Sequence, residues 1–156
     1  MTKKKVYIES TIPSYLVGRS SRDIIVLAHQ DITQTWWVKC RHKFDLFVSP
    51  AVVKEVSDGD STLSEKRLEL IENITMLDFH EDIEKLAMQY FSKFSIPQKS
   101  VLDVFHIAYA VFHKIDFLLT WNCKHLANAN IIQSLYRLND RLGHTTPVIC
   151  TPEELS

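Results

Sequence analysis

The segment 117–129, which reads FLLTWNCKHLANA, joins an apolar run to a cluster of groups that can contact a ligand. The apolar part has the composition of a buried strand. It is followed by Asn122, and Lys124 and His125 come directly afterwards. A strand that leads into an ordinary surface loop usually ends in Gly, Pro or Asp. An amide, a cation and an imidazole at this place instead indicate side chains gathered at a site.

Three carboxylates occupy comparable places elsewhere in the chain. Glu9 directly follows the strand-like segment 5–8, and Glu55 lies on a short predicted helix, six residues beyond Ser49. Asp103 lies in the first turn of the helix that precedes the segment 117–120. Together with the amide of Asn122, these carboxylates form a set of hard oxygen ligands, which suit Mg²⁺ or Mn²⁺.

Each of these residues also has an ordinary structural explanation. Glu9 fits a surface carboxylate at a strand end, and Glu55 fits an exposed helix glutamate. Asp103 forms with Ser100 a capping-box sequence, in which the acid would bond back to the start of its helix. His106, one turn after Asp103, is more often a hydrogen-bonded core histidine than a ligand. However, Asp103 and His106 share one apolar stripe of that helix with residues 107 and 110, which favours an inward orientation.

Strand-like and helical segments alternate along the chain. We predict strands at 5–8, 46–49, 74–79, 117–120 and 147–151, and helices from 21 or 23 to 42 and at 50–58, 61–73, 81–94, 100–113 and 131–142. This alternation is typical of an α/β domain with a mainly parallel sheet. In such sheets ligands bind beyond the carboxyl ends of the strands, where the candidate residues lie.

The composition sets broad limits on the function. The 156 residues show no repeat or linker and are expected to form a single domain, 1–156. The apolar runs are too short to span a bilayer and no segment resembles a signal peptide, so we expect a cytosolic protein without membrane contact. Three widely spaced cysteines favour reduced thiols. With a net charge of −1, nucleic-acid binding would depend on a local basic patch, for which 19–22 (RSSR) and 38–43 (VKCRHK) are candidates.

Four blocks of the sequence resemble the PIN-domain ribonucleases, a family that includes the toxin subunits of many bacterial toxin–antitoxin pairs. VYIESTIPSYL is similar to the opening strand of that family with its acidic residue, and VSPAVVKEVSDGD is similar to its second acidic block. The segment 100–129 resembles the third and fourth blocks, in which an aspartate opens a helix and a strand ends in Thr-x-Asp or Thr-x-Asn. The resemblance covers essentially the whole chain.

This resemblance implies a fold, a reaction and partners. The fold is a three-layer α/β/α sandwich around a parallel sheet, with strand order 3-2-1-4-5. The activity is hydrolysis of RNA by a nuclease that requires Mg²⁺ or Mn²⁺. Glu9, Glu55 and Asp103 would hold the metal ion directly or through water, and Asn122 would assist them. The toxin members further imply a cognate antitoxin protein and a homodimer.

The sequence departs from the family at two corners of this site. Glu9 stands where the family usually has Asp, and Asn122 stands where Asp is frequent, so the anionic set is reduced to three carboxylates. Ser10 or Thr11 would orient the attacking water or a ligand carboxylate. Lys124, His125 and Asn128 would contact phosphate or hold the loop.

Two other functions remain open on the sequence alone. One is a catalytically weak PIN-like module that binds RNA or a protein partner without cleavage, which the two departures and the near-neutral charge favour. The other is a phosphate-handling enzyme of a different doubly wound fold. The segment ESTIPS, which stands where such enzymes carry a Gly-rich loop after the first strand, argues against the latter.

Overall fold

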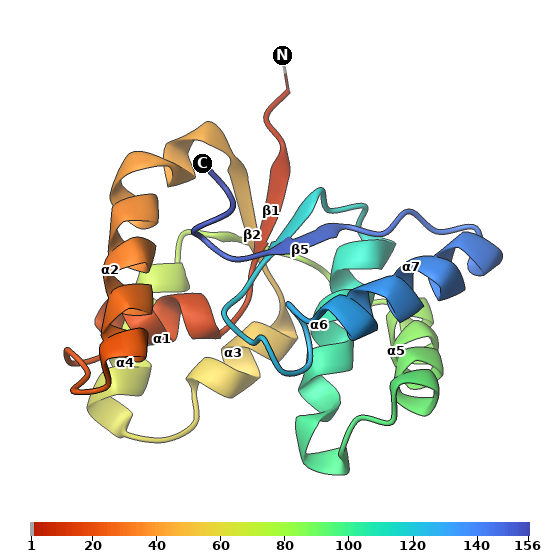
Figure 1. The fold of residues 1–156 in the computed structure, drawn as a ribbon, viewed down its shortest axis with the longest axis horizontal. Coiled ribbons are helices and arrows are strands. Elements are labelled where there is room, and N and C mark those ends of the chain that lie inside the picture. Colours follow the sequence, from red (N-terminus) through yellow and green to blue (C-terminus); the bar gives the residue numbers. More distant parts are fainter. Residues whose placement is uncertain (1) are drawn as a thin grey trace.

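The computed structural model describes residues 2–156 and contains one five-stranded parallel sheet with the order β3-β2-β1-β4-β5 (Figure 1). The strands are Lys5–Ile8 (β1), Asp45–Val48 (β2), Thr75–Met76 (β3), Phe117–Leu119 (β4) and Val148–Cys150 (β5). The predicted α/β class and the strand order 3-2-1-4-5 are therefore confirmed.

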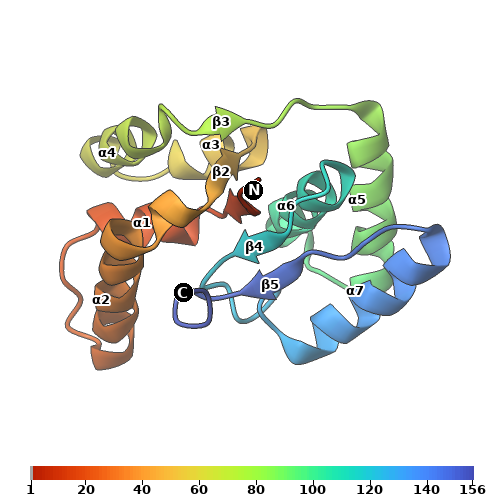
Figure 2. The same cartoon turned by 90° about the horizontal axis from the view of Figure 1, so that it is seen from above.

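Helices cover both faces of this sheet. They are Thr11–Val17 (α1), Ile24–Lys39 (α2), Pro50–Val56 (α3), Ser61–Ile71 (α4), Glu81–Phe94 (α5), Val101–Phe112 (α6) and Ala129–Leu142 (α7), with short 3₁₀ turns at Arg41–Lys43 and Gln98–Ser100. Figure 2 shows α1, α2 and α4 on one side of the sheet and α5, α6 and α7 on the other. This is the predicted three-layer sandwich.

The central strand β1 places the start of the candidate site. Val6, Tyr7 and Ile8 are fully buried, as expected for a strand with neighbours on both edges and helices on both faces. The backbone N–H of Glu9 donates to the carbonyl of Leu119 at 3.1 Å, which continues the pairing of β1 with β4 by one residue. β1 and β4 therefore end next to each other, and Glu9 lies beside the loop that follows Leu119.

Two helices begin where side-chain caps predict. Ser49 accepts a hydrogen bond from the N–H of Ala51, and Pro50 occupies the first position of α3. Asp23 accepts from the N–H groups of Ile25 and Val26 at the start of α2. The Ser49 cap matters for the site, because it fixes where α3 begins and hence where Glu55 lies.

The spacing of residues 24, 27, 28, 32 and 36 predicts one apolar face along α2, and the structure corrects this prediction at the start of the helix. Ile24, expected to lie on the inward stripe, is 80% exposed, while Thr33 and Trp36 are buried. Only the later turns of α2 pack against the body of the molecule, so an apolar stripe that runs along the whole helix is wrong at its start.

β3 is shorter than the predicted strand at 74–79, because it lies at the edge of the sheet and pairs with β2 alone. Within residues 2–156, no helix combines the length and apolar character that crossing a bilayer requires.

Candidate metal site

Glu9 is a buried carboxylate that directly follows β1. Its side chain is held by two hydroxyl groups, since Thr11 Oγ1 donates to Oε1 at 2.6 Å and Thr120 Oγ1 donates to the same oxygen at 2.5 Å. Burial raises the pKa of Glu9, and the charge of His106 and the two hydroxyl hydrogen bonds oppose that increase only in part. Glu9 is 2% exposed. A cation beside Glu9 would therefore stabilise its ionised carboxylate.

Glu55 reaches the same place from α3. Ser10 Oγ donates to its Oε1 at 2.9 Å, and Nε2 of His106 pairs with that same oxygen. Burial would raise the pKa of Glu55, but the hydrogen bond and the positive charge of His106 outweigh burial and lower it. Glu55 is therefore held as a carboxylate.

His106 is fully buried on α6 and joins the acidic residues to the sheet. Its Nδ1 shares a 2.6 Å hydrogen bond with the hydroxyl of Tyr7, which in turn shares a 2.7 Å hydrogen bond with Ser49 Oγ. Burial would lower the pKa of His106, but the hydrogen bond to Glu55 and the charges of Glu9 and Glu55 raise it. The imidazole thus orients Glu55 and supplies it with a positive partner.

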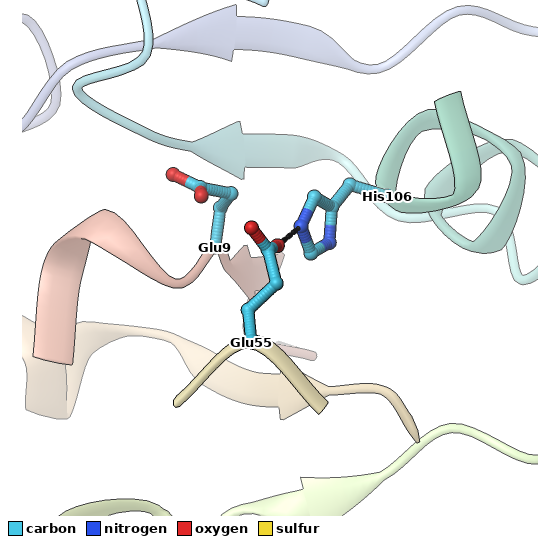
Figure 3. A group of neighbouring side chains, drawn as sticks. All are labelled: Glu9, Glu55 and His106. Carbon is cyan, nitrogen blue, oxygen red and sulfur yellow. Dashed lines mark hydrogen bonds and ion pairs between the residues drawn. The ribbon is translucent and has the colours of Figure 1, made fainter. Parts of the chain in front are cut away.

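We call these residues the Glu9–Glu55–His106 cluster. One ligand atom from each lies within 4.8 Å of the others, and Figure 3 shows the three side chains as neighbours, with Glu55 paired to His106. Among the described residues, the hydrogen bonds of both glutamates end on Oε1, so Oε2 of each carboxylate accepts none. Two buried or half-buried carboxylate oxygens without a donor fit a divalent cation.

The second group is the Asp103–Asn122–His125 cluster, which lies where α6 faces the loop after β4. Asn122 Nδ2 donates to Asp103 Oδ1 at 3.2 Å, and His125 Nδ1 pairs with Asp103 Oδ2 at 2.8 Å. The Asp103 side chain therefore faces this loop and does not cap its own helix. Both of its oxygens have protein partners.

Asn122 holds the loop as well as Asp103. Its Oδ1 accepts from the backbone N–H groups of Lys124 and His125, at 3.2 and 3.0 Å. This network assigns the amide so that its nitrogen, and not its oxygen, points to Asp103. In this arrangement Asn122 orients the acid, whereas the sequence predicts that it assists a metal ion as a ligand.

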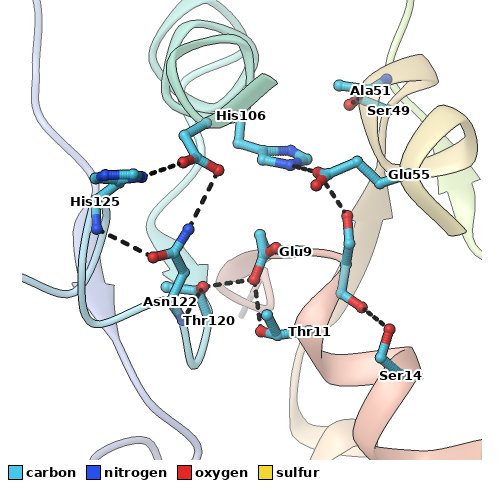
Figure 4. Close-up of polar contacts among 12 residues, drawn as sticks. Glu9, Thr11, Ser14, Ser49, Ala51, Glu55, His106, Thr120, Asn122 and His125 are labelled. Carbon is cyan, nitrogen blue, oxygen red and sulfur yellow. Dashed lines mark hydrogen bonds and ion pairs between the residues drawn. The ribbon is translucent and has the colours of Figure 1, made fainter. Parts of the chain in front are cut away.

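Thr120 joins the two clusters. Its hydroxyl donates to Glu9 and accepts the backbone N–H of Asn122 at 2.9 Å. Figure 4 shows Glu9 between Thr11 and Thr120, with Glu55 and His106 on one side and Asn122 and His125 on the other. The two clusters thus form one continuous polar edge at the carboxyl ends of β1 and β4.

The sequence predicts the acidic residues of the site and only some of the residues that support them. The sequence predicts one site formed by Glu9, Glu55, Asp103 and Asn122. In the structure Glu9 and Glu55 lie together with His106, whereas Asp103 and Asn122 contact each other in the second cluster. His106 was assigned to the core, and it is both buried and part of the site; its position one turn after Asp103 was the available signal. Nothing in the sequence indicates that Tyr7 supports the site, because a buried tyrosine in a strand is common.

The accessory residues that the sequence predicts have different roles in the structure. Ser10 and Thr11 donate to Glu55 and Glu9, so they hold carboxylates, one of the two roles predicted for them. Asn128 caps α7 by accepting from the N–H groups of residues 130 and 131. Lys124 is exposed.

Comparisons with known proteins support the fold. No protein-family model matches the sequence, and a search of curated proteins gives no significant match. Among solved structures, the chain is similar to a crystal structure of VapBC2 from Rickettsia felis bound to a DNA fragment from their promoter. The TM-score is 0.59 at 12% sequence identity, and the match covers 94% of this chain and 98% of that chain. At this identity the likeness concerns the fold, and it confirms the PIN-like fold that the sequence motifs predict.

Proposed function

We propose that this protein is a divalent-metal-dependent endoribonuclease that hydrolyses RNA phosphodiester bonds. The observation that carries the proposal is the Glu9–Glu55–His106 cluster at the carboxyl edge of a parallel sheet. Each glutamate has one carboxylate oxygen that accepts no hydrogen bond from residues 2–156. A buried acidic cluster of this kind is costly unless a cation offsets its charge. It is therefore better explained by metal-assisted chemistry than by stability of the fold.

The residues of the site would have two kinds of role in hydrolysis, as metal ligands and as supports that orient these ligands. Glu9 and Glu55 would hold Mg²⁺ or Mn²⁺ through their Oε2 atoms, with Asp103 contributing through water because both its oxygens already have partners. A bound divalent ion would activate water and offset charge on the phosphodiester. His106 keeps Glu55 ionised and oriented, and Thr11 and Thr120 fix Glu9. Asn122 and His125 fix the orientation of the Asp103 carboxylate.

A cleavage assay on a mixture of structured and unstructured RNAs tests this function. The wild-type protein should cleave RNA with Mn²⁺ or Mg²⁺ and lose activity with a chelator. A Glu9→Gln variant should lose activity while it folds normally. Cleavage that persists in Glu9→Gln or in excess chelator would contradict the proposal, because either result removes the role of the acidic cluster.

We further propose that the ribonuclease acts as the toxin of a toxin–antitoxin pair. The structural neighbour VapBC2 is a PIN-domain toxin–antitoxin complex, and the match extends over nearly all of both chains. A partner protein that silences the enzyme, and a homodimer of the kind common in the family, would follow. Expression of the chain should arrest growth of a bacterial host, whereas the Glu9→Gln variant should not. Growth arrest by both proteins would mean that toxicity does not come from RNA cleavage.

One feature favours a second candidate, a PIN-like module that binds RNA or protein without cleavage. Asp103 has a protein partner on each oxygen, and the Asn122 amide presents its nitrogen to the site. Such a module would bind RNA with the same affinity in wild-type and Glu9→Gln proteins and would release no product with any divalent metal. The cleavage assay therefore separates the two candidates directly.

A further inference from the structure

We propose that Tyr15, His29 and Trp121 form a stacking platform for an unpaired nucleobase beside the acidic site. The proposal rests on the proposed ribonuclease function and adds to it the kind of substrate that the site accepts, a single-stranded segment of RNA. Bases stack on aromatic side chains only when they are not enclosed in a helix, and this contact tolerates any base because each has a π-face.

The three rings form one continuous aromatic layer. The rings of His29 and Trp121 stack with centroids 3.9 Å apart and an interplanar angle of 12°. Tyr15 lies 6.4 Å from His29 at 26° and 6.4 Å from Trp121 at 32°. The His29 ring covers one face of Trp121, which is buried, while Tyr15 and His29 are half-buried and keep contact with solvent.

Trp121 is fixed at two points by hydrogen bonds, so its ring is held in place before any ligand binds. Its backbone N–H donates to Thr11 Oγ1 at 2.8 Å, and its indole Nε1–H donates to Thr33 Oγ1 at 2.7 Å. Thr33 lies one turn after His29 on α2 and donates to the His29 carbonyl at 2.5 Å. A platform ordered in advance loses little conformational entropy when a base stacks on it.

The platform directly adjoins the acidic residues. Trp121 follows Thr120, which bonds to Glu9, and Thr11 bonds to both Glu9 and the Trp121 backbone. Tyr15 lies one helical turn after Thr11, on the same face of α1. Burial raises the pKa of the Tyr15 hydroxyl, and the charges of Cys123 and Glu9 raise it further, which agrees with a position close to the site. A base on this platform would bring its phosphate near Glu9.

A basic loop lies next to the platform. The loop between α1 and α2 carries Arg19 and Arg22, both exposed, and forms the RSSR patch singled out in the sequence. Gln30, the neighbour of His29, fastens this loop by donating to the Arg19 carbonyl and accepting from the Ser21 N–H, each at 2.9 Å. Two cations beside an aromatic layer are the combination that single-stranded nucleic acids require.

Binding measurements in the presence of a chelator test the platform without cleavage. The probes are a short single-stranded oligoribonucleotide of mixed sequence, the same oligomer with its central bases removed, and the corresponding duplex. Tyr15→Leu removes the aromatic face, and Tyr15→Phe keeps it; the Tyr15 hydroxyl has no hydrogen bond among the described residues, which makes the pair matched. Tyr136→Leu alters an exposed tyrosine on α7 and serves as a distant control.

We expect Tyr15→Leu to bind the intact oligomer about ten- to one-hundredfold more weakly than wild type, while Tyr15→Phe and Tyr136→Leu match wild type. Wild type should bind the abasic oligomer and the duplex with a similar loss. Tyr15→Leu should not discriminate between the intact and abasic oligomers, which a purely structural role of Tyr15 would not produce. His29→Leu and His29→Phe form a second pair, and the abasic comparison on wild type needs no variant, so a folding defect in Tyr15→Leu does not block the test.

Separate outcomes overturn the two proposals. If wild type cleaves RNA with Mn²⁺ but binds intact and abasic oligomers equally, or binds the duplex as tightly as the single strand, the platform is wrong and the ribonuclease stands. If wild type binds single strands through the platform but cleaves nothing with any divalent metal, the ribonuclease is wrong and the platform stands. If wild type binds no RNA at all, both are wrong.

Discussion

The Glu9–Glu55–His106 cluster and the Asp103–Asn122–His125 cluster contain the same kinds of groups and satisfy them differently. Each pairs a carboxylate with an imidazole. Within the described part of the chain, both glutamates of the first cluster keep one oxygen without a hydrogen-bond donor, whereas Asp103 has a partner on each oxygen. The first cluster therefore has carboxylate oxygens available to a cation. The second is closed, because side chains of the loop after β4 occupy both oxygens of Asp103. A shared residue type at a shared sheet edge does not imply a shared role.

The comparison also ranks the carboxylates by how well the protein compensates their charge. Glu55 pairs with His106, whose raised pKa favours the charged imidazole, and Asp103 has a hydrogen-bond partner on each oxygen. Glu9, although 2% exposed, accepts its side-chain hydrogen bonds among residues 2–156 from two neutral hydroxyls, and the charge of His106 acts on it without a direct hydrogen bond. A buried charge costs more free energy when fewer hydrogen bonds and opposite charges surround it. Glu9 should therefore depend most on a bound cation.

Glu9→Gln should give the largest effect. We expect RNA cleavage to fall by more than about a hundredfold, since even the loss of a residue that only supports a metal ligand commonly costs ten- to one-hundredfold. Without metal the melting temperature should rise, because the amide removes a carboxylate whose pKa burial raises. Mn²⁺ should raise the melting temperature of wild type but not of the variant. A variant that is stabilised by Mn²⁺ as much as wild type would place the ion elsewhere.

Asp103→Asn should have a smaller effect, because Asp103 belongs to the closed cluster. We expect activity to fall about ten- to one-hundredfold, with Mn²⁺ still stabilising the folded protein. The measurement is cleavage rate as a function of Mn²⁺ concentration. If Asp103→Asn abolishes both cleavage and the Mn²⁺-dependent stabilisation, Asp103 is a direct ligand and the two clusters have equal roles.

The sequence predicts the fold better than it predicts the division between the clusters. The alternation of apolar strands and helices, together with caps such as Ser49, places the acids at one edge of a parallel sheet, because β-α alternation leaves few topologies. These signals are local. The exposed start of α2 at Ile24 was predicted wrongly, since the extent of helix packing depends on residues far away in the chain.

The partners of each acid depend on contacts between distant segments. Tyr7 and His106 are 99 residues apart, and Asp103 and His125 are 22 apart. The motif at Asp103 therefore fits both a helix cap and a site residue until the loop after β4 is in place. The amide of Asn122 likewise acquires its orientation only from the N–H groups of that loop.

Asn122→Ala should show that the closed cluster depends on its loop. The variant loses the donor to Asp103 and the acceptor for two backbone N–H groups, so we expect a loss of about 1–2 kcal/mol in the free energy of unfolding and roughly tenfold in activity. Asn128→Ala is the matched control, since it removes a similar cap at α7 without contact to the acids. Equal losses of activity in both variants would mean that general loosening of the loop, and not the orientation of Asp103, is responsible.

The smallest effect should be the pH dependence that the Glu55–His106 pair gives to metal-free stability. The pKa of His106 is raised from 6.5, so its contribution is complete below that value and is lost as pH rises through the folded-state pKa. The pKa of Glu55 is lowered from 4.5, so its contribution is present above that value and is lost as pH falls through the folded-state pKa. In chelator, the free energy of unfolding of wild type should therefore exceed that of Glu55→Gln most clearly between pH 4.5 and 6.5, by about 2 kcal/mol. The difference should shrink on either side of this range.

The raised pKa of Glu9 is common to both proteins and largely cancels in this difference in the free energy of unfolding. Denaturant titrations across this range measure it, and a difference that does not change with pH would mean that the pair is a neutral hydrogen bond, which removes the charge asymmetry between Glu55 and Glu9.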